Sequence, residues 1–97
     1  MTRYVVLLSF SEKGIVAVME SLDRADSFKE AAAKVGAKVE SVYWTLGSYD
    51  GMFVLSAPDE ETAAALVLKL ARGTSVRTCM LRAFEADEFL KVLSKVS

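Results

Sequence analysis

The chain has 97 residues and a net charge of -1, with 12 Lys and Arg against 13 Asp and Glu, and 53% of its residues are hydrophobic. This length suits one domain, 1–97, with one core, and so apolar a composition excludes a disordered chain. The balanced charge offers nucleic acid no broad basic field, while the lack of His and the single Cys exclude His-based catalytic pairs, zinc-finger ligand sets and internal disulfides.

The first predicted strand covers residues 3–10, where β-branched and aromatic residues alternate between the two sides of a pleat. Its apolar stretch is too short for a signal peptide or a membrane span. Ser11 predicts the N-cap of a helical region that ends at Gly36, a typical left-handed stop, with a bend or restart at 21–23. Two apolar stripes predict the buried side of this region: Ile15, Val18, Met19 and Leu22, then Phe28, Ala31, Ala32 and Val35.

Residues 38–46 and 52–57 predict two strands of a hairpin, because the turn-forming residues 47–51 separate them. Simple alternation puts Val39 and Tyr43 on one side of the first strand and Val42 and Trp44 on the other.

The last third of the chain predicts a helix, a strand and a short helix. Pro58 and the three acidic residues after it indicate a helix start, and this helix ends near Gly73. Residues 76–84 predict a fourth strand, and residues 86–96 predict a terminal helix.

This element order predicts an α+β, ferredoxin-like βαββαβ fold with a C-terminal helix. Both crossover helices then cover the same face of a four-stranded antiparallel sheet. The other face is left bare, although the strands carry large apolar side chains on both sides. We therefore expect a homodimer, or a higher oligomer of dimers, in which the bare sheet faces meet.

Several segments resemble one known family. The hairpin run Leu46-Gly47-Ser48-Tyr49-Asp50 and the helix start at 57–61 are similar to the signature of the GYD domain family. The resemblance extends through 4–7, 14–15 and 36–43 to 76–78 and 81–84, and so spans nearly the whole chain. It implies a dimeric α/β barrel of ferredoxin-like units but little chemistry, because the wider superfamily includes oxygenases, isomerases, haem proteins and ligand sensors. The chain departs from the family pattern at Ser56 and at Cys79-Met80.

Tyr49 and Asp50 are candidate ligand-binding residues, because a phenol and a carboxylate at a hairpin tip can bind or polarise a ligand that enters a cleft. The structural alternative is that Asp50 caps backbone amides of the turn and Tyr49 packs over a strand end. Both interpretations stay open for this pair.

Three further candidates are Arg24, at the helix break, and Arg77 and Tyr43, on strands. An Arg aimed into a cleft grips a carboxylate or an enolate-like anion, whereas its structural alternative is an ion pair. Arg77 and Arg82 are five residues apart and are predicted on opposite faces. Tyr43 and its neighbour Trp44 either pack in the core and at the subunit interface or line a pocket, and Cys79 is expected as a small buried thiol.

The sequence favours a small-ligand binding domain or an assembly module. The alternative is a cofactor-independent monooxygenase or isomerase that acts on a small, largely apolar substrate. We expect no cofactor, no metal, and neither nucleic acid nor a membrane as partner. The single unpaired thiol favours the cytoplasm, a reducing compartment.

Overall fold

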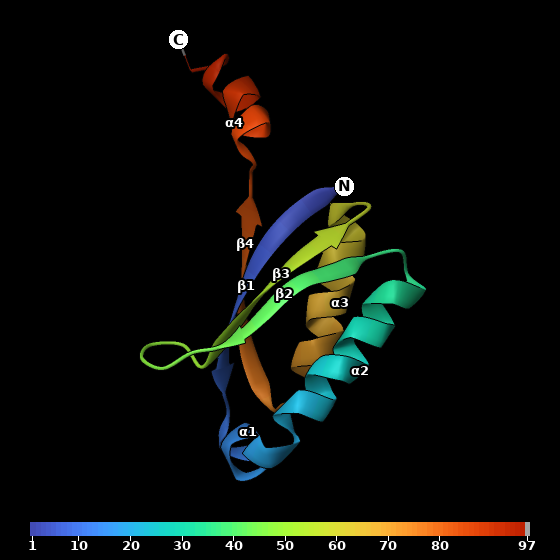
Figure 1. Ribbon diagram of the computed structural model, residues 1–97, viewed down its shortest axis with the longest axis vertical. Helices are drawn as coiled ribbons and strands as arrows, with labels where there is room; N and C mark the ends of the chain where they lie inside the picture. The colour runs from blue at the N-terminus through green and yellow to red at the C-terminus, as the bar shows by residue number, and fades with distance from the viewer. Residues whose placement is uncertain (97) are drawn as a thin grey trace.

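One antiparallel sheet in the order β2-β3-β1-β4 organises the chain in the computed structural model, which describes residues 1–96. Its strands are β1 (Thr2–Phe10), β2 (Lys38–Trp44), β3 (Gly51–Ala57) and β4 (Val76–Ala83). Helices α2 (Ser21–Lys34) and α3 (Glu60–Arg72) lie on the same side of this sheet (Figure 1). The predicted ferredoxin-like α+β fold is confirmed for the single chain.

The core lies between the sheet and these two helices. Phe28 of α2 packs against Phe53 of β3 with ring centroids 4.9 Å apart. Small residues on both helices let them approach the strands closely, which buries the large side chains of β1 and β3. The buried apolar residues are Tyr4, Val6, Ala32, Ala37, Phe53, Leu55, Ala57, Ala63, Leu66 and Val67.

The first helical region is divided as predicted, but slightly earlier, at Ala17. A short helix α1 (Glu12–Val16) and a 3-10 turn η1 (Val18–Glu20) precede α2. The Ser11 hydroxyl accepts the Gly14 N–H at 3.1 Å, so the predicted N-cap is confirmed.

The first of the two stripes predicted to be buried is wrong, whereas Phe28, Ala31 and Ala32 of the second lie in or against the core. Ile15, Met19 and Leu22 are 55%, 91% and 66% exposed. Because α1 and η1 do not continue the axis of α2, the two stripes do not form one face, and the first stripe points to solvent.

A β-bulge corrects the predicted faces of β2. The register with β3 shifts between Val39 and Ser41, so Val39 lies opposite Leu55 and Val42 opposite Phe53. Val39 thus shares the helix-covered side with Val42 and Trp44, whereas simple alternation had grouped it with Tyr43. The extra residue in the bulge, Glu40, causes this change of side.

The opposite side of the sheet carries no helix, and we call it the uncovered face. The register of β1 with its neighbours places Val5 there between Val54 and Leu81, and Leu7 between Met52 and Cys79. Arg3, Tyr43 and Arg77 surround this apolar centre. Cys79 is exposed, so the expectation of a buried thiol is wrong for the single chain, because nothing in residues 1–96 lies over this part of β4.

Helix α4 (Ala86–Leu93) stands clear of the sheet beyond the end of β4 (Figure 1). Ion pairs join Arg3 to Glu85 and Arg82 to Glu88, and Glu85 and Glu88 form a capping box at the start of the helix. The chain therefore measures 50 × 31 × 19 Å along its principal axes. The large apolar side chains that α4 leaves exposed are those of Phe89, Leu90, Val92 and Leu93.

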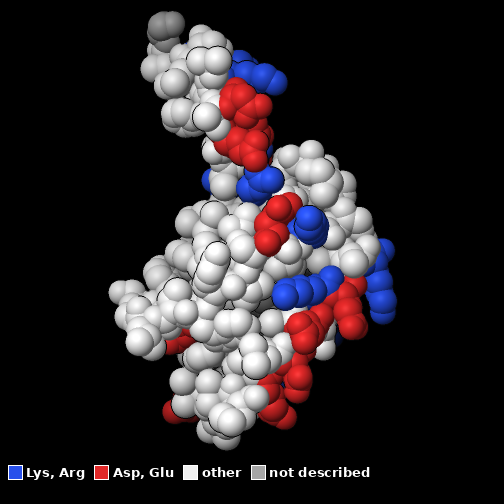
Figure 2. Space-filling model, in the orientation of Figure 1, with Lys and Arg blue, Asp and Glu red and all other residues white. Residues whose placement is uncertain are grey.

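Charged side chains are unevenly distributed over the surface of the molecule. Figure 2 shows acidic and basic side chains gathered over the side of α2 and α3 and on the projecting helix α4, which we call the arm, while the left part of the view is mostly uncharged. Among residues 1–96, no helix combines the length and the apolar character that crossing a bilayer requires.

Candidate functional site

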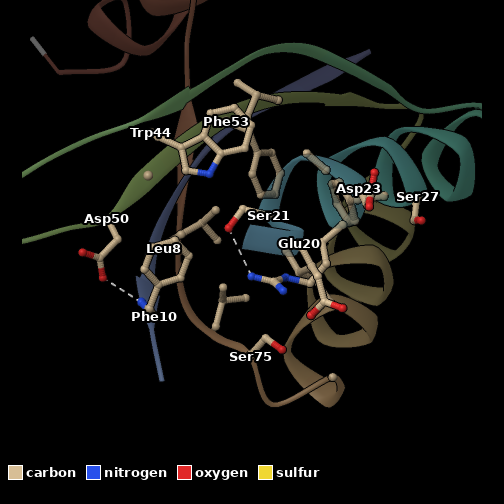
Figure 3. A pocket seen from close by; sticks show the side chains of 18 of the residues that line it. Leu8, Phe10, Glu20, Ser21, Asp23, Ser27, Trp44, Asp50, Phe53 and Ser75 are labelled. Atoms are coloured by element: carbon tan, nitrogen blue, oxygen red, sulfur yellow. Dashed lines mark hydrogen bonds between the residues drawn. The ribbon is translucent and has the colours of Figure 1, made fainter. Parts of the chain in front are cut away.

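A cavity of about 580 Å³ lies between the helix-covered side of the sheet and the segment formed by α1, η1 and α2 (Figure 3). Its volume falls within the range of small-molecule sites. Polar groups from α1, η1, α2, α3 and two loops interrupt a mainly apolar wall, and the cations among them are Lys13, Arg24 and Lys69. The apolar side chains of that wall include Leu8, Phe10, Phe28, Val42, Trp44, Phe53, Leu70 and Val76.

Backbone contacts with the loop after α3 hold α1 at the edge of this cavity. The Ser11 N–H donates to the Ser75 carbonyl at 3.0 Å, and the Lys13 ammonium donates to the Gly73 carbonyl at 3.0 Å. Gly14 lies so close to this loop that a Cβ there would sit 2.0 Å from the Ser75 oxygen. Only glycine permits this approach, so Gly14 fixes the position of one cavity wall.

Arg24 lies at the end of the first turn of α2 and lines the cavity. Its Nη1 donates to the Ala17 carbonyl at 3.0 Å, and its Nη2 donates to the Ser21 hydroxyl at 3.3 Å, the dashed line at Ser21 in Figure 3. The guanidinium is therefore oriented by the helix break itself. The sequence predicted this residue as a ligand-binding candidate, and the structure places it at the cavity.

Asp50 borders the same cavity, but its carboxylate has a structural partner. Oδ2 accepts the Phe10 N–H at 2.7 Å, and the Asp50 N–H donates to the Leu8 carbonyl at 2.8 Å (Figure 3). These bonds tie the hairpin to the end of β1. Asp50 thus binds a backbone amide, but this amide belongs to β1 and not to the turn that the structural alternative named. Tyr49 is absent from the described lining, and its carbonyl accepts the Thr45 hydroxyl at 2.7 Å within the turn.

The remaining candidate residues lie on the strands, and they are divided between the two faces of the sheet. Tyr43 borders the cavity from β2, but its register opposite Met52 directs the side chain to the uncovered face. Arg77 lies opposite Ser9 on the uncovered face, and Arg82 lies opposite Tyr4 on the helix side, so the predicted separation of these two arginines is confirmed. The cavity thus brings together Arg24 and Asp50. Tyr43 touches its border with the side chain on the other face, and Tyr49 and Arg77 lie outside it.

The aromatic walls are what sequence reasoning missed, since Phe28 and Trp44 were assigned mainly to packing. A signal for Phe28 was present. Arg24, Phe28 and Ala31 are spaced at i, i+4 and i+7, which places all three on one side of a helix. Extending the predicted second stripe back by one turn would have brought Arg24 into the same surface.

One carboxylate has a shifted pKa, and it lies elsewhere. Asp59 is the N-cap of α3, where its carboxylate accepts the Thr62 N–H at 2.7 Å. This hydrogen bond lowers the pKa of Asp59 from its ordinary value of 3.8. Asp59 is not among the residues that line the cavity, so this shift belongs to helix capping.

Comparison with known proteins gives one family and several similar chains. The model of the GYD domain matches residues 4–93. The chain is 29% identical over 91 residues to the "Glutamine synthetase and cystathionine beta-lyase binding protein" of Thermus thermophilus, covering 93% of this chain and 96% of that protein.

Two solved structures are also similar. The crystal structure of TTHA0845 from Thermus thermophilus has a TM-score of 0.56 at 26% identity, covering 89% of this chain and 96% of that one. An ACT domain protein from Streptococcus pneumoniae has a TM-score of 0.46 at 16% identity, with 86% and 90% covered.

Proposed function

The chain belongs to the GYD domain family, and from that premise we propose that it is a homodimeric binding domain whose cavity takes a small, largely apolar ligand. The observation that carries this proposal is the cavity of about 580 Å³ with its aromatic and aliphatic wall. Apolar cavities with a few converging polar groups are the usual form of small-molecule sites. The cytoplasm, expected from the unpaired thiol, is part of the same proposal.

The uncovered face supports the homodimer. Val5, Leu7 and Val54 form its apolar centre on the two inner strands, and Leu81, which is 46% exposed, extends it onto β4. A sheet face that meets water is normally polar. A second copy placed face to face would remove these side chains from water, and a typical interface of about 800 Å² per partner is within the reach of a four-stranded sheet.

Helix α4 belongs to the same proposed interface. The rings of Phe84 and Phe89 lie 6.3 Å apart, and Phe89, Leu90 and Leu93 are exposed, so the arm carries an apolar surface of its own just beyond the end of β4. The ion pairs Arg3–Glu85 and Arg82–Glu88 hold the arm away from its own sheet. In a face-to-face dimer the arm is free to pack on the other copy.

Native mass spectrometry of protein purified from its own host tests both parts of the proposal. We expect a mass of twice 10.6 kDa, plus any retained small molecule. Val5→Glu places a charge at the centre of the uncovered face and should yield the single chain. Leu68→Glu is the matched control, because Leu68 is 67% exposed on α3 and lies outside the interface. A wild-type single chain at micromolar concentration would contradict the homodimer.

A second candidate is an assembly module that binds an enzyme. It is favoured by the name of the Thermus relative, which describes binding to glutamine synthetase and cystathionine beta-lyase. Sedimentation of this chain mixed with each of the two purified enzymes from its own host tests this candidate. A complex of defined stoichiometry supports it, and independent sedimentation with both contradicts it.

The alternative of a cofactor-independent monooxygenase or isomerase has less support. Such chemistry needs a general base or an anion-stabilising group that reaches the substrate. The carboxylate of Asp50 is already bonded to the Phe10 amide, and Glu20 and Asp23 are exposed at the cavity. These positions suit a binding site better than a catalytic one.

A further inference from the structure

Arg24 distinguishes this cavity from a simple apolar pocket. We propose that the cavity selects apolar molecules that carry one carboxylate or sulfonate, and that the Arg24 guanidinium binds this anionic group. The inference rests on the proposed ligand-binding function and names the class of ligand. Four properties of the site support it: donor capacity, missing counter-charge, position on the helix and the chemistry of the wall.

The guanidinium has unused donors in a fixed orientation. Arginine carries five N–H donors. One bonds the Ala17 carbonyl at 3.0 Å and another bonds the Ser21 hydroxyl at 3.3 Å, and residues 1–96 supply no acceptor to the others. A carboxylate can therefore be bound by two N–H groups without breaking a bond that orients the side chain.

No carboxylate of the described chain neutralises Arg24. The ion pairs found in residues 1–96 join Arg3 to Glu85 and Arg82 to Glu88. Three acids line the cavity beside Arg24, but Asp50 is bonded to a backbone amide, and Glu20 and Asp23 are exposed while Arg24 is half-buried. The charge of Arg24 is thus less hydrated than the acids and lacks a partner, which favours an incoming anion.

The position of Arg24 on α2 adds to this preference. The N-terminal turn of a helix carries a partial positive charge, so a cation near it is disfavoured unless an anion lies nearby. Arg24 is the fourth residue of α2. An anion at the guanidinium would be stabilised by the side chain and by the helix end together.

The apolar wall of the cavity determines the chemistry of the part of the ligand that lies away from Arg24. Phe28 lies one turn after Arg24 and contacts the ring of Phe53, and Leu8 and Val42 continue the apolar surface. A bare inorganic anion would leave this wall without contacts, and a neutral apolar molecule would leave the guanidinium unpaired. A molecule with an apolar body and one anionic group satisfies both regions.

Two fluorescent dyes that share a skeleton test the inference: 8-anilinonaphthalene-1-sulfonate and its neutral parent, N-phenyl-1-naphthylamine. We expect Arg24→Met to weaken binding of the sulfonate about tenfold or more, as for loss of a hydrogen-bonded charge pair, and to change binding of the neutral dye less than about twofold. Arg24→Lys keeps the positive charge but not the planar pair of N–H donors, so its affinity for the sulfonate dye should lie between those of the wild type and Arg24→Met. Displacement of the sulfonate dye by 2-naphthoate extends the test to a carboxylate.

Cavity-filling variants show where the dyes bind. Ala31→Phe fills the cavity from α2, and Ser27→Trp covers its exposed rim; either should abolish binding of both dyes, with circular dichroism confirming the fold. If both dyes bind in the cavity and Arg24→Met weakens them equally or not at all, the inference is wrong and the proposed ligand-binding function stands. If neither dye binds, or if a folded cavity-filled variant binds as wild type does, the proposed function itself is contradicted.

Discussion

Tyr4 lies in the core and carries a buried polar atom that lacks a hydrogen-bond partner in the described part of the chain. The residue is 4% exposed, and its hydroxyl has no hydrogen-bond partner within residues 1–96. The guanidinium of Arg82 lies 5.7 Å from the centre of the Tyr4 ring, over its face and not at its hydroxyl. The ring therefore contributes packing and a cation–π contact, while the buried hydroxyl costs free energy.

Replacing Tyr4 with Phe should therefore stabilise the protein. We expect Tyr4→Phe to raise the free energy of unfolding by about 1 kcal/mol, because it removes an unsatisfied buried group and keeps the ring. Urea denaturation measures the change. Tyr49→Phe is the matched control, since Tyr49 is 40% exposed in the hairpin turn and is not among the residues that line the cavity, and it should change stability by less than about 0.5 kcal/mol. A loss of stability in Tyr4→Phe would mean that the hydroxyl has a partner in solution.

Among the elements, strands β1, β3 and β4 and helix α3 follow closely from local sequence signals. Alternation, turn residues and acidic residues after Pro58 are short-range features, and they locate these elements to within one or two residues. The bulge in β2 is invisible in the sequence, because Glu40 is an ordinary residue for a strand edge. The first predicted stripe, which spans α1, η1 and the start of α2, was wrong because apolar spacing indicates a helix face without saying what covers it.

The candidate site was accessible to sequence reasoning in part. Arg24 stood out because a charged residue followed a helix break, and the break is what orients its guanidinium. The cavity itself depends on how closely α1 approaches the loop after α3 and on which face β2 presents. Both are tertiary properties, so its aromatic wall could not be assigned from spacing alone.

The N-cap of α3 makes the stability of this helix depend on pH. The folded-state pKa of Asp59 is lowered by the Thr62 amide, so the cap's contribution is present above the unfolded-state pKa and is lost as pH falls through the folded-state value. Asp59→Asn retains a good N-cap without a titrating group. We expect its thermal midpoint to fall less than that of wild type between about pH 5 and pH 2. Parallel midpoint curves for the two proteins would contradict this assignment.

At the scale of the whole molecule, the single chain is more extended than a compact domain of its size. Its radius of gyration is 14.5 Å, against about 13 Å for a compact domain of 100 residues. The difference follows from α4, which projects beyond the sheet (Figure 1). An arm in this position adds little to the stability of its own chain.

Truncation after Phe84 tests this division of roles. In the Val5→Glu background, which isolates the single chain, we expect the free energy of unfolding to fall by at most about 1–2 kcal/mol, the value of two surface ion pairs. In the wild-type background, the same truncation should weaken the dimer about tenfold or more, measured by dilution in sedimentation velocity. A large loss of stability in the single chain would show that α4 packs on its own sheet.

The bulge at Glu40 has a consequence for how ligand preference can change in such a fold. Because side chains alternate along a strand, the bulge places the indole of Trp44, and not the phenol of Tyr43, on the side of the sheet that holds the cavity. If β2 kept all its residues but paired without the bulge, residues 41–44 would slip by one position against β3, and the two rings would exchange faces. A change in strand register, with every aromatic residue retained, would then alter which ring lines the cavity.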